Sequence, residues 1–180
     1  MTTTPPPSPS TFTTARLDVL PLRVEHAEEM ARVLGDPALH TFIGGAPDTV
    51  EELRARYRRM LAGSPDPTVV WLNWVVRLRG EERLVGTVQA TVGGDRVAEV
   101  AWVVGTPWQG RGIATEAARA LVAWLGEQGV EVFVAHIHPE HHASVAVATA
   151  CGLAPTDEWH DGEVKWELSG RPEAPSGPCR

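Results

Sequence analysis

The chain has 180 residues, of which 43% are hydrophobic and 22% are charged, proportions that are typical of a folded protein rather than of a disordered chain. This length favours one domain with a core of its own. The net charge is −7 and no segment is rich in Lys and Arg, which argues against a nucleic-acid partner, because such a partner requires a concentrated basic face. No apolar run approaches the roughly 18–20 residues that span a bilayer, so no membrane partner is expected.

Both ends of the sequence have the composition of tails. Residues 1–13 and 169–180 are rich in Pro, Ser, Thr and Gly, and such segments bury too little apolar surface to order themselves. We therefore expect two disordered tails around a single domain over residues 14–168. The N-terminal segment lacks the basic and apolar regions of a secretory signal. A disulfide between Cys151 and Cys179 is not expected because Cys179 falls in a tail, and a reducing cytoplasm fits these features.

Hydrophobic periodicity and turn residues predict the element order β-α-α-β-β-β-α-β-α-β-β. The expected elements are a strand over 16–22, helices over 25–34 and from about 48 to 62, strands over 69–78, 83–92 and 97–105, a helix over 112–127, a strand over 132–137, a helix over 141–151, and strands over 154–159 and 163–168. Thr49 and Glu52 have the spacing of a capping box at the start of the second helix. This order predicts an α/β fold with a mostly antiparallel, twisted sheet flanked by helices. Its parallel crossover joins strand 97–105 to strand 132–137.

The stretch from Val97 to Glu116 carries the clearest chemical signal. A strand runs into a turn that contains Gly110 and Gly112, and a helix begins directly after the turn. The first backbone N–H groups of a helix have no partner within the helix, and the helix dipole adds partial positive charge there. Glycines let a bulky anion approach that backbone. The segment therefore predicts a phosphate-binding site, to which Arg111 could add a charged contact.

The residues around this turn argue against two common phosphate-binding motifs. A P-loop requires a lysine and a Ser or Thr after the last glycine, where Ile113 and Ala114 stand instead. A dinucleotide fingerprint requires three glycines in a longer βαβ unit, which the segment from Gln109 to Ala114 does not supply. A glycine-rich connection between a strand and a helix, without any ligand, remains a second interpretation of the same residues.

Residues Gln109 to Ala114 resemble the Gln/Arg-x-x-Gly-x-Gly/Ala signature with which GCN5-related N-acetyltransferases, the GNAT superfamily, hold the pyrophosphate of coenzyme A. A second motif, Pro139 to Ser144 followed by Cys151-Gly152-Leu153, looks like the Pro-x-Asn-x-x-Ser…Gly-Phe helix of the RimJ/RimL-like branch, which acetylates ribosomal-protein N-termini. The resemblance covers about residues 14–168. It implies a GNAT-like fold and direct transfer of an acetyl group, in a ternary complex and without a metal, from acetyl-CoA to a primary amine of a small molecule or a protein N-terminus.

The same resemblance implies which residues act. The donor site it implies consists of Trp102, Val103, Val104, Gln109, Gly110, Arg111, Gly112, Ile113, Ala114, Thr115, His141 and Ser144. A backbone N–H of Val103 or Val104 is expected to meet the developing oxyanion. Glu99 is expected to act as the general base through water, because an aliphatic amine is almost entirely protonated at neutral pH. Ser144 is expected to protonate the departing thiolate.

Two residues depart from the family pattern. His141 stands where the family has an asparagine, although an imidazole can make one such hydrogen bond. Ala148 stands where many relatives have a tyrosine that serves as the acid. Two alternatives therefore stay open: transfer from another acyl-CoA such as succinyl-CoA, or a non-catalytic coenzyme A-binding sensor or interaction module. The sequence does not identify the acceptor amine, and exposed strand edges leave room for a homodimer.

Three further sets of side chains could serve binding, and the tryptophans among them lie on or near strands beside the expected acceptor cleft. The tryptophans are Trp71, Trp74, Trp102 and Trp108; they would suit a flat substrate, but core packing is the stronger interpretation. The histidines are His136, His138, His141, His142 and His160, and their spacing argues against convergence on a zinc ion. Asp157, Glu158 and Asp161 would bring negative charge to the substrate mouth, although a charged hairpin is usually just solvated.

Overall fold

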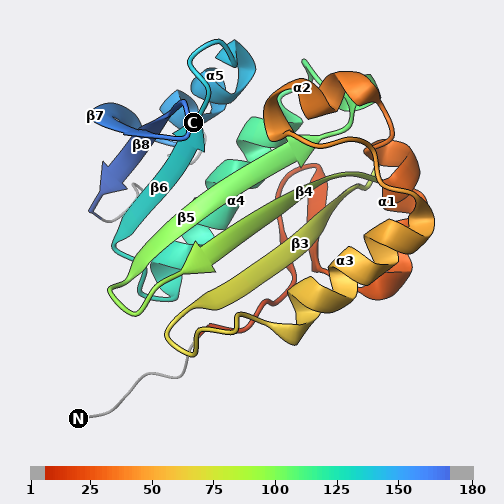
Figure 1. Cartoon of the computed structure of the whole chain (residues 1–180), viewed down its shortest axis with the longest axis horizontal. Coiled ribbons are helices and arrows are strands. Elements are labelled where there is room, and N and C mark those ends of the chain that lie inside the picture. Colours follow the sequence, from red (N-terminus) through yellow and green to blue (C-terminus); the bar gives the residue numbers. More distant parts are fainter. Residues whose placement is uncertain (1–6, 171–180) are drawn as a thin grey trace, which may run out of the picture.

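The computed structural model describes residues 7–170, which form an 8-stranded sheet with helices on both faces (Figure 1). The strand order is β1-β2-β3-β4-β5-β6-β8-β7. Among these strands β5 and β6 run parallel, and all other neighbours are antiparallel. The structure therefore confirms the mostly antiparallel α/β fold and the parallel crossover that the sequence predicts.

The elements follow the expected order closely. The strands are β1 (Phe12–Thr13), β2 (Leu17–Pro21), β3 (Val70–Leu78), β4 (Arg83–Val92), β5 (Val97–Val104), β6 (Val132–Ile137), β7 (Ala154–His160) and β8 (Glu163–Ser169). The helices are α1 (Ala27–Val33), α2 (His40–Ile43), α3 (Val50–Ala62), α4 (Ile113–Glu127) and α5 (His142–Ala150), with 3-10 turns at Val24–His26, Pro37–Leu39 and Thr106–Trp108. Every strand and helix that the sequence predicts is present, and β1 and α2 are additional.

Strand β1 corrects the expectation of a disordered tail over residues 1–13. Phe12 pairs with Val19 of β2, and its ring packs edge-on against Trp74 and is stacked on Trp124. The indole N–H of Trp74 donates to the Ser10 carbonyl at 2.9 Å. The tail interpretation is therefore wrong for residues 10–13, because aromatic contacts hold them on the sheet.

The expectation of a disordered C-terminal tail is likewise wrong for residues 169 and 170. Ser169 ends β8, and the N–H of Gly170 donates to the Glu131 carbonyl at 3.0 Å. The remaining residues of the two expected tails, 1–6 and 171–180, lie outside the described part of the chain.

Each face of the sheet has its own core, because successive side chains of a strand point to opposite faces. On one face α4 packs through Ile113 and Leu121 on a core that includes Trp74 and Phe133. On the other face α1 and α3 cover residues of β2, β3 and β4, as the core around Val75 shows. In Figure 1 these two helices lie at one side of the sheet and leave β5 and β6 uncovered. The sheet is therefore open on this face along β5 and β6.

The parallel strands β5 and β6 separate part of the way along their length. They pair only from Val97 with Val132 to Glu99 with Val134. Beyond Glu99, β5 continues beside β4 as far as Val104, and within the described residues its other edge has no pairing strand. The backbone N–H and C=O groups on that edge have no strand partner among the described strands. Buried backbone polar groups normally have a hydrogen-bond partner, so a bound ligand could fill this role.

Candidate active site

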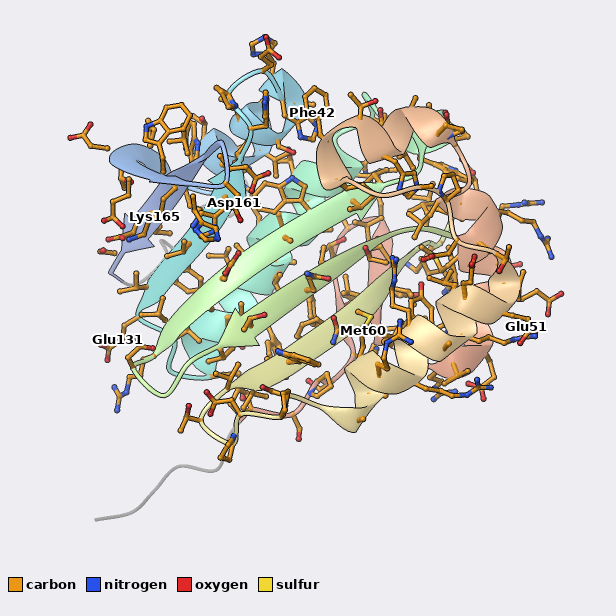
Figure 2. All side chains as sticks on the ribbon, in the orientation of Figure 1. Phe42, Glu51, Met60, Glu131, Asp161 and Lys165 are labelled. Carbon is orange, nitrogen blue, oxygen red and sulfur yellow. The ribbon has the colours of Figure 1, made fainter. Side chains whose placement is uncertain are left out.

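A cavity of about 530 Å³ lies at the end of β5, between the first turn of α4, helix α5 and the segment around α2. All residues expected at the donor site line this cavity except Arg111: they are Trp102, Val103, Val104, Gln109, Gly110, Gly112, Ile113, Ala114, Thr115, His141 and Ser144. The structure thus brings together two motifs that are about 30 residues apart. The opposite wall is formed by Ala38, Leu39, Phe42 and Ile43, and Figure 2 shows Phe42 between α2 and α5.

The first turn of α4 opens onto the cavity because two glycines take left-handed conformations. Gly110 has φ 70° and Gly112 has φ 74°, values that residues with a side chain rarely adopt. Gly112 occupies the N-cap position, and no side chain of the described residues caps this end of α4. The first N–H groups of the helix are therefore free to bind a ligand, at the positive end of the helix dipole. This geometry suits a phosphate group.

Arg111 lies on the outer side of the turn. Its guanidinium donates to Glu81 Oε1 at 2.9 Å, and the indole N–H of Trp108 donates to Glu81 Oε2 at 2.8 Å. These two hydrogen bonds, that of Trp108 first, hold the pKa of Glu81 below its usual range. On the inner side, the Gln109 side-chain amide donates to the Val104 carbonyl at 3.0 Å. The turn is thus fastened both to the end of β5 and to the loop that contains Glu81.

Glu116 anchors the glycine turn through Arg16, a structural role that was not predicted from the sequence. Its carboxylate, in the first turn of α4, accepts hydrogen bonds from the Thr14 hydroxyl, from the Arg16 backbone N–H at 2.9 Å and from Arg16 Nε at 2.7 Å. Arg16 Nη1 then donates to the Arg111 carbonyl at 3.0 Å. Burial opposes ionisation of Glu116, but the hydrogen bonds outweigh it and hold the pKa of this carboxyl below its usual range.

Strand geometry distinguishes the backbone of Val104 from that of Val103. The N–H of Gly105 donates to the Val85 carbonyl in β4 at 2.8 Å, and alternate residues of an antiparallel strand turn their peptide groups to the same side. The Val103 N–H therefore points to β4. The Trp102 and Val104 N–H groups point to the edge from which β6 has separated. Of the two valines expected to serve an oxyanion, the structure leaves Val104, and not Val103, with an N–H at that edge.

The first turn of α5 brings Ser144 and His141 to the cavity. Ser144 Oγ lies 3.5 Å from His141 Nε2. The His141 ring is stacked on Phe42, with ring centroids 4.3 Å apart and an angle of 4° between the planes. Burial, with a smaller contribution from the charge of His138, lowers the pKa of His141. His141 is therefore neutral at pH 7 and able to share a proton with the serine hydroxyl.

Glu99 lies outside this cavity, on the open face of the sheet. Its side chain is 56% exposed, and Oε1 lies 3.0 Å from Nδ1 of His136 on β6. A second, polar hollow of about 360 Å³ is lined by Glu99, His136, Glu158, Trp159, His160 and Lys165. The sequence singled out four of these residues, namely Glu99, His136, Glu158 and His160, but gave no signal that Glu99 pairs with a histidine.

The tryptophans divide between the core and the cavity. Trp74 is 1% exposed within the core, and Trp71 is 37% exposed. Trp102 and Trp108 line the cavity. Within residues 7–170, no three His, Cys, Asp or Glu side chains are arranged to hold a metal ion. None of the helices in the same part of the chain is long and apolar enough to cross a bilayer.

Solved structures with the same fold cover almost the whole described chain. An acetyltransferase of the GNAT family from Bacillus anthracis is 20% identical, with a TM-score of 0.75 over 89% of this chain and 98% of that one. RimL, a ribosomal L7/L12 α-N-protein acetyltransferase solved in complex with coenzyme A, is 15% identical, with a TM-score of 0.76 over 90% of this chain and 99% of that one. The ribosomal-protein-S5-alanine acetyltransferase from Vibrio fischeri is 17% identical, with a TM-score of 0.73 over 89% of this chain and 97% of that one.

These likenesses show the fold, and two of the three structures are ribosomal-protein acetyltransferases, in line with the resemblance to the RimJ/RimL-like branch. No curated protein sequence matches the chain. The family comparison is direct: residues 16–154 match the acetyltransferase (GNAT) domain. Because this match covers most of the sequence, the chain belongs to the GNAT acetyltransferase family.

Proposed function

We propose that this protein transfers an acetyl group from acetyl-CoA to a primary amine, and that the 530 Å³ cavity binds the donor. The observation that carries the proposal is the uncapped start of α4, where Gly110 and Gly112 turn backbone N–H groups toward the cavity. Such groups suit the pyrophosphate of coenzyme A. The free edge of β5 and the apolar wall around Phe42 suit an extended pantetheine arm. RimL, which shares the fold, was solved with coenzyme A.

The residues around the cavity can serve the steps of acyl transfer. The amine nitrogen forms a bond to the thioester carbonyl carbon, the C–S bond breaks, and the sulfur gains a proton. The Val104 N–H lies on the free edge of β5, where it can stabilise an oxyanion; one such donor contributes about 3–4 kcal/mol. Ser144 can supply the proton to sulfur, with His141 Nε2 at 3.5 Å from its hydroxyl.

Removal of the amine proton requires a group on the open side of the sheet. An ammonium group loses its proton at pH 7 only with difficulty, since aliphatic amines titrate near pH 10.4. Glu99 is a carboxylate on that side, at the last paired position of β5 and β6. Glu99 takes part in this step, and the proton passes either through water or through the imidazole of His136, which Glu99 contacts.

An acidic acyl donor such as succinyl-CoA is less well supported than acetyl-CoA. A second carboxylate at the acyl end would require a nearby cation. Among residues 7–170, the ionisable residues that line the cavity are Glu140, His141 and His142, without Lys or Arg. Burial lowers the pKa of His141, so this imidazole is neutral at pH 7. The lining therefore favours an uncharged acyl group.

The test is amine-dependent release of free thiol from acetyl-CoA by the purified protein, with putrescine, tyramine and a hexapeptide with a free N-terminus as acceptors. We expect turnover with at least one acceptor and a roughly 100-fold lower kcat for Ser144→Ala, the usual size of a general-acid contribution. Thr149→Ala is the matched control, because Thr149 lies on the same helix and bonds the Val145 carbonyl; it should stay within about twofold of wild type. Binding of acetyl-CoA without turnover on any amine would favour the non-catalytic alternative.

A further inference from the structure

His136 and Glu99 form a hydrogen-bonded pair on the face of the sheet that α1 and α3 leave open. His136 Nδ1 lies 3.0 Å from Glu99 Oε1. An ionised carboxylate can only accept hydrogen bonds, so the proton must be on Nδ1 and the lone pair of the ring on Nε2. The His136 side chain is 21% exposed, against 56% for Glu99. The pair can therefore act as a base. The carboxylate of Glu99 orients the mostly solvent-shielded imidazole of His136, and Nε2 of the ring is left to accept a proton.

The strand register places His136 closer to the donor cavity than Glu99. Glu99 is level with Val134 in the parallel pair, and His136 is two residues further along β6. At about 3.3 Å per residue it lies about 7 Å further toward the end of β5, where Val103 lines the cavity. Val103 and Glu99 are four residues apart on one strand and so share the open face. An amine at the acyl group on this face therefore lies nearer to His136 than to Glu99.

Lys165, the cation that lines the hollow, is already paired with two carboxylates. Lys165 of β8 is the cross-strand neighbour of His136. Its Nζ contacts Glu158 Oε2 at 3.1 Å and Glu167 Oε2 at 3.2 Å. Hydrogen bonds to Glu158 and then to Glu167 raise the pKa of Lys165, so the lysine stays charged and paired.

The other groups facing His136 are acidic or imidazole side chains. The His160 ring of β7 has its centroid 5.7 Å from that of His136, and His160 Nε2 lies 3.3 Å from Asp161 Oδ2. Figure 2 shows Asp161 and Lys165 at this edge of the molecule. With Glu99 on β5 and Glu158 on β7, the surroundings carry more negative than positive charge. Such a hollow favours a cationic ligand.

We propose that the polar hollow receives the ammonium end of a cationic acceptor, and that His136, positioned by Glu99, takes the proton of that ammonium group. This inference rests on the acetyltransferase function proposed above and specifies how its acceptor side works. Trp159, which lines the hollow and is 62% exposed, offers an aromatic face to the cation. Histidine is the side chain that most often serves as a general acid or base in enzymes.

The proton and bond changes balance in this scheme. One proton moves from the ammonium nitrogen to His136 Nε2, and Glu99 offsets the charge of the resulting imidazolium. The nitrogen lone pair then forms the C–N bond, the C–S bond breaks, and the second proton lost by the nitrogen balances the one gained by the sulfur. His136 returns its proton to solvent. A substrate ammonium and a thioester thus give an amide, a thiol and one released proton.

The test compares His136→Ala, His136→Gln and Glu99→Gln with wild type, using putrescine, tyramine and the free-N-terminus hexapeptide as acceptors. We expect both His136 variants to bind acetyl-CoA as wild type does and to lose about 100-fold or more in kcat. Added imidazole should restore His136→Ala at least tenfold, because the small side chain leaves room for it, and should not restore Glu99→Gln. The matched control is Glu131→Gln, which removes an exposed carboxylate paired with Arg96 at the far end of the sheet.

The outcomes separate this inference from the proposed function. Wild-type turnover together with a His136→Ala kcat within threefold of wild type, or a loss that imidazole does not restore, would overturn the role of His136 and leave the acetyltransferase function standing. Absence of turnover by wild type would overturn the function itself. A third readout needs no turnover: long-range ¹H–¹⁵N spectra should show His136 as the Nδ1–H tautomer, and the Nε2–H tautomer would contradict the pairing with Glu99.

Discussion

Replacement of Glu116 by alanine should weaken both the fold and the donor site. The carboxylate is 19% exposed and accepts three hydrogen bonds, one from Thr14 and two from Arg16, whose own side chain is 44% exposed. A hydrogen bond to a charged group contributes about 1.5–3 kcal/mol when buried, and exposure of the arginine reduces its share toward the ~1 kcal/mol of a surface pair. We expect a loss of about 2 kcal/mol, or about 4–8 °C in Tm for a chain of this size.

The pH dependence of this loss follows from the lowered pKa of Glu116. A group whose pKa is lower in the folded state stabilises the protein above its unfolded pKa, about 4.3 for glutamate, and loses that contribution as the pH falls through the folded value. The Tm difference between wild type and Glu116→Ala should therefore be full at pH 7 and shrink below about pH 4. Thermal unfolding at pH 7, 5 and 3 measures it.

Donor affinity gives a second readout of the same change. Arg16 holds the Arg111 carbonyl within the glycine turn, so Arg16 loses its anchor in Glu116→Ala. A cost of about 1 kcal/mol to reorder the turn would weaken acetyl-CoA binding about fivefold. The control is Glu127→Ala, since Glu127 is exposed at the other end of α4. A Tm for Glu116→Ala within 1 °C of that control at pH 7, or an equal Tm difference at all three pH values, would refute the reasoning.

The remaining predictions concern one strand contact, the cavity wall and a partly buried thiol. A Cβ at Gly86 would lie 2.2 Å from the Val103 carbonyl oxygen, so Gly86→Ala should lower the free energy of unfolding by about 2–3 kcal/mol, measured with urea. The control Gly80→Ala should be nearly neutral, because a Cβ there would have nothing within 4 Å. Equal effects of the two changes would contradict the contact. Phe42, 36% exposed, should be dispensable for Tm, but Phe42→Ala should weaken acetyl-CoA binding about tenfold by calorimetry; unchanged affinity would contradict its place in the donor site. Burial raises the pKa of Cys151 to about 11, so at pH 8 it should react with a disulfide reagent at least about 100-fold more slowly than free cysteine, measured in a variant whose other cysteine is serine; fast labelling would contradict its burial.

Features set by neighbouring residues could be predicted from the sequence. The start of α3 is an example: the Glu52 N–H donates to the Thr49 hydroxyl at 3.3 Å, and the Thr49 N–H donates to the Glu52 carboxylate at 2.8 Å. Both partners lie within one turn, so spacing alone identifies the cap. The glycine turn before α4 is local in the same way, and it identified most of the residues that line the donor cavity.

Features set by distant residues could not be predicted. Phe12 stands among threonines, and its contact with Trp124 spans more than 100 positions. Helix α2 has four residues, too few for periodicity, and it is held by the His40 ring, which contacts the Leu34 and Gly44 carbonyls at 3.1 and 3.2 Å.

The pairing of Glu99 with a histidine was missed for the same reason. Glu99 and His136 are 37 positions apart, and their contact depends on where β5 and β6 stop pairing. The sequence placed Glu99 on its strand but carried no local signal for the register between the two strands.

Calorimetric titration with acetyl-CoA tests the donor site most directly, with wild type, Gly112→Trp and Gly129→Trp compared side by side. Both glycines have left-handed φ values, 74° and 91°, at opposite ends of α4, so the two variants share the backbone strain and differ in position relative to the cavity. We predict micromolar binding for wild type and Gly129→Trp and its loss in Gly112→Trp, with Tm values showing that both variants fold. Absence of binding by wild type, or equal binding by the two variants, would contradict a donor site at the start of α4.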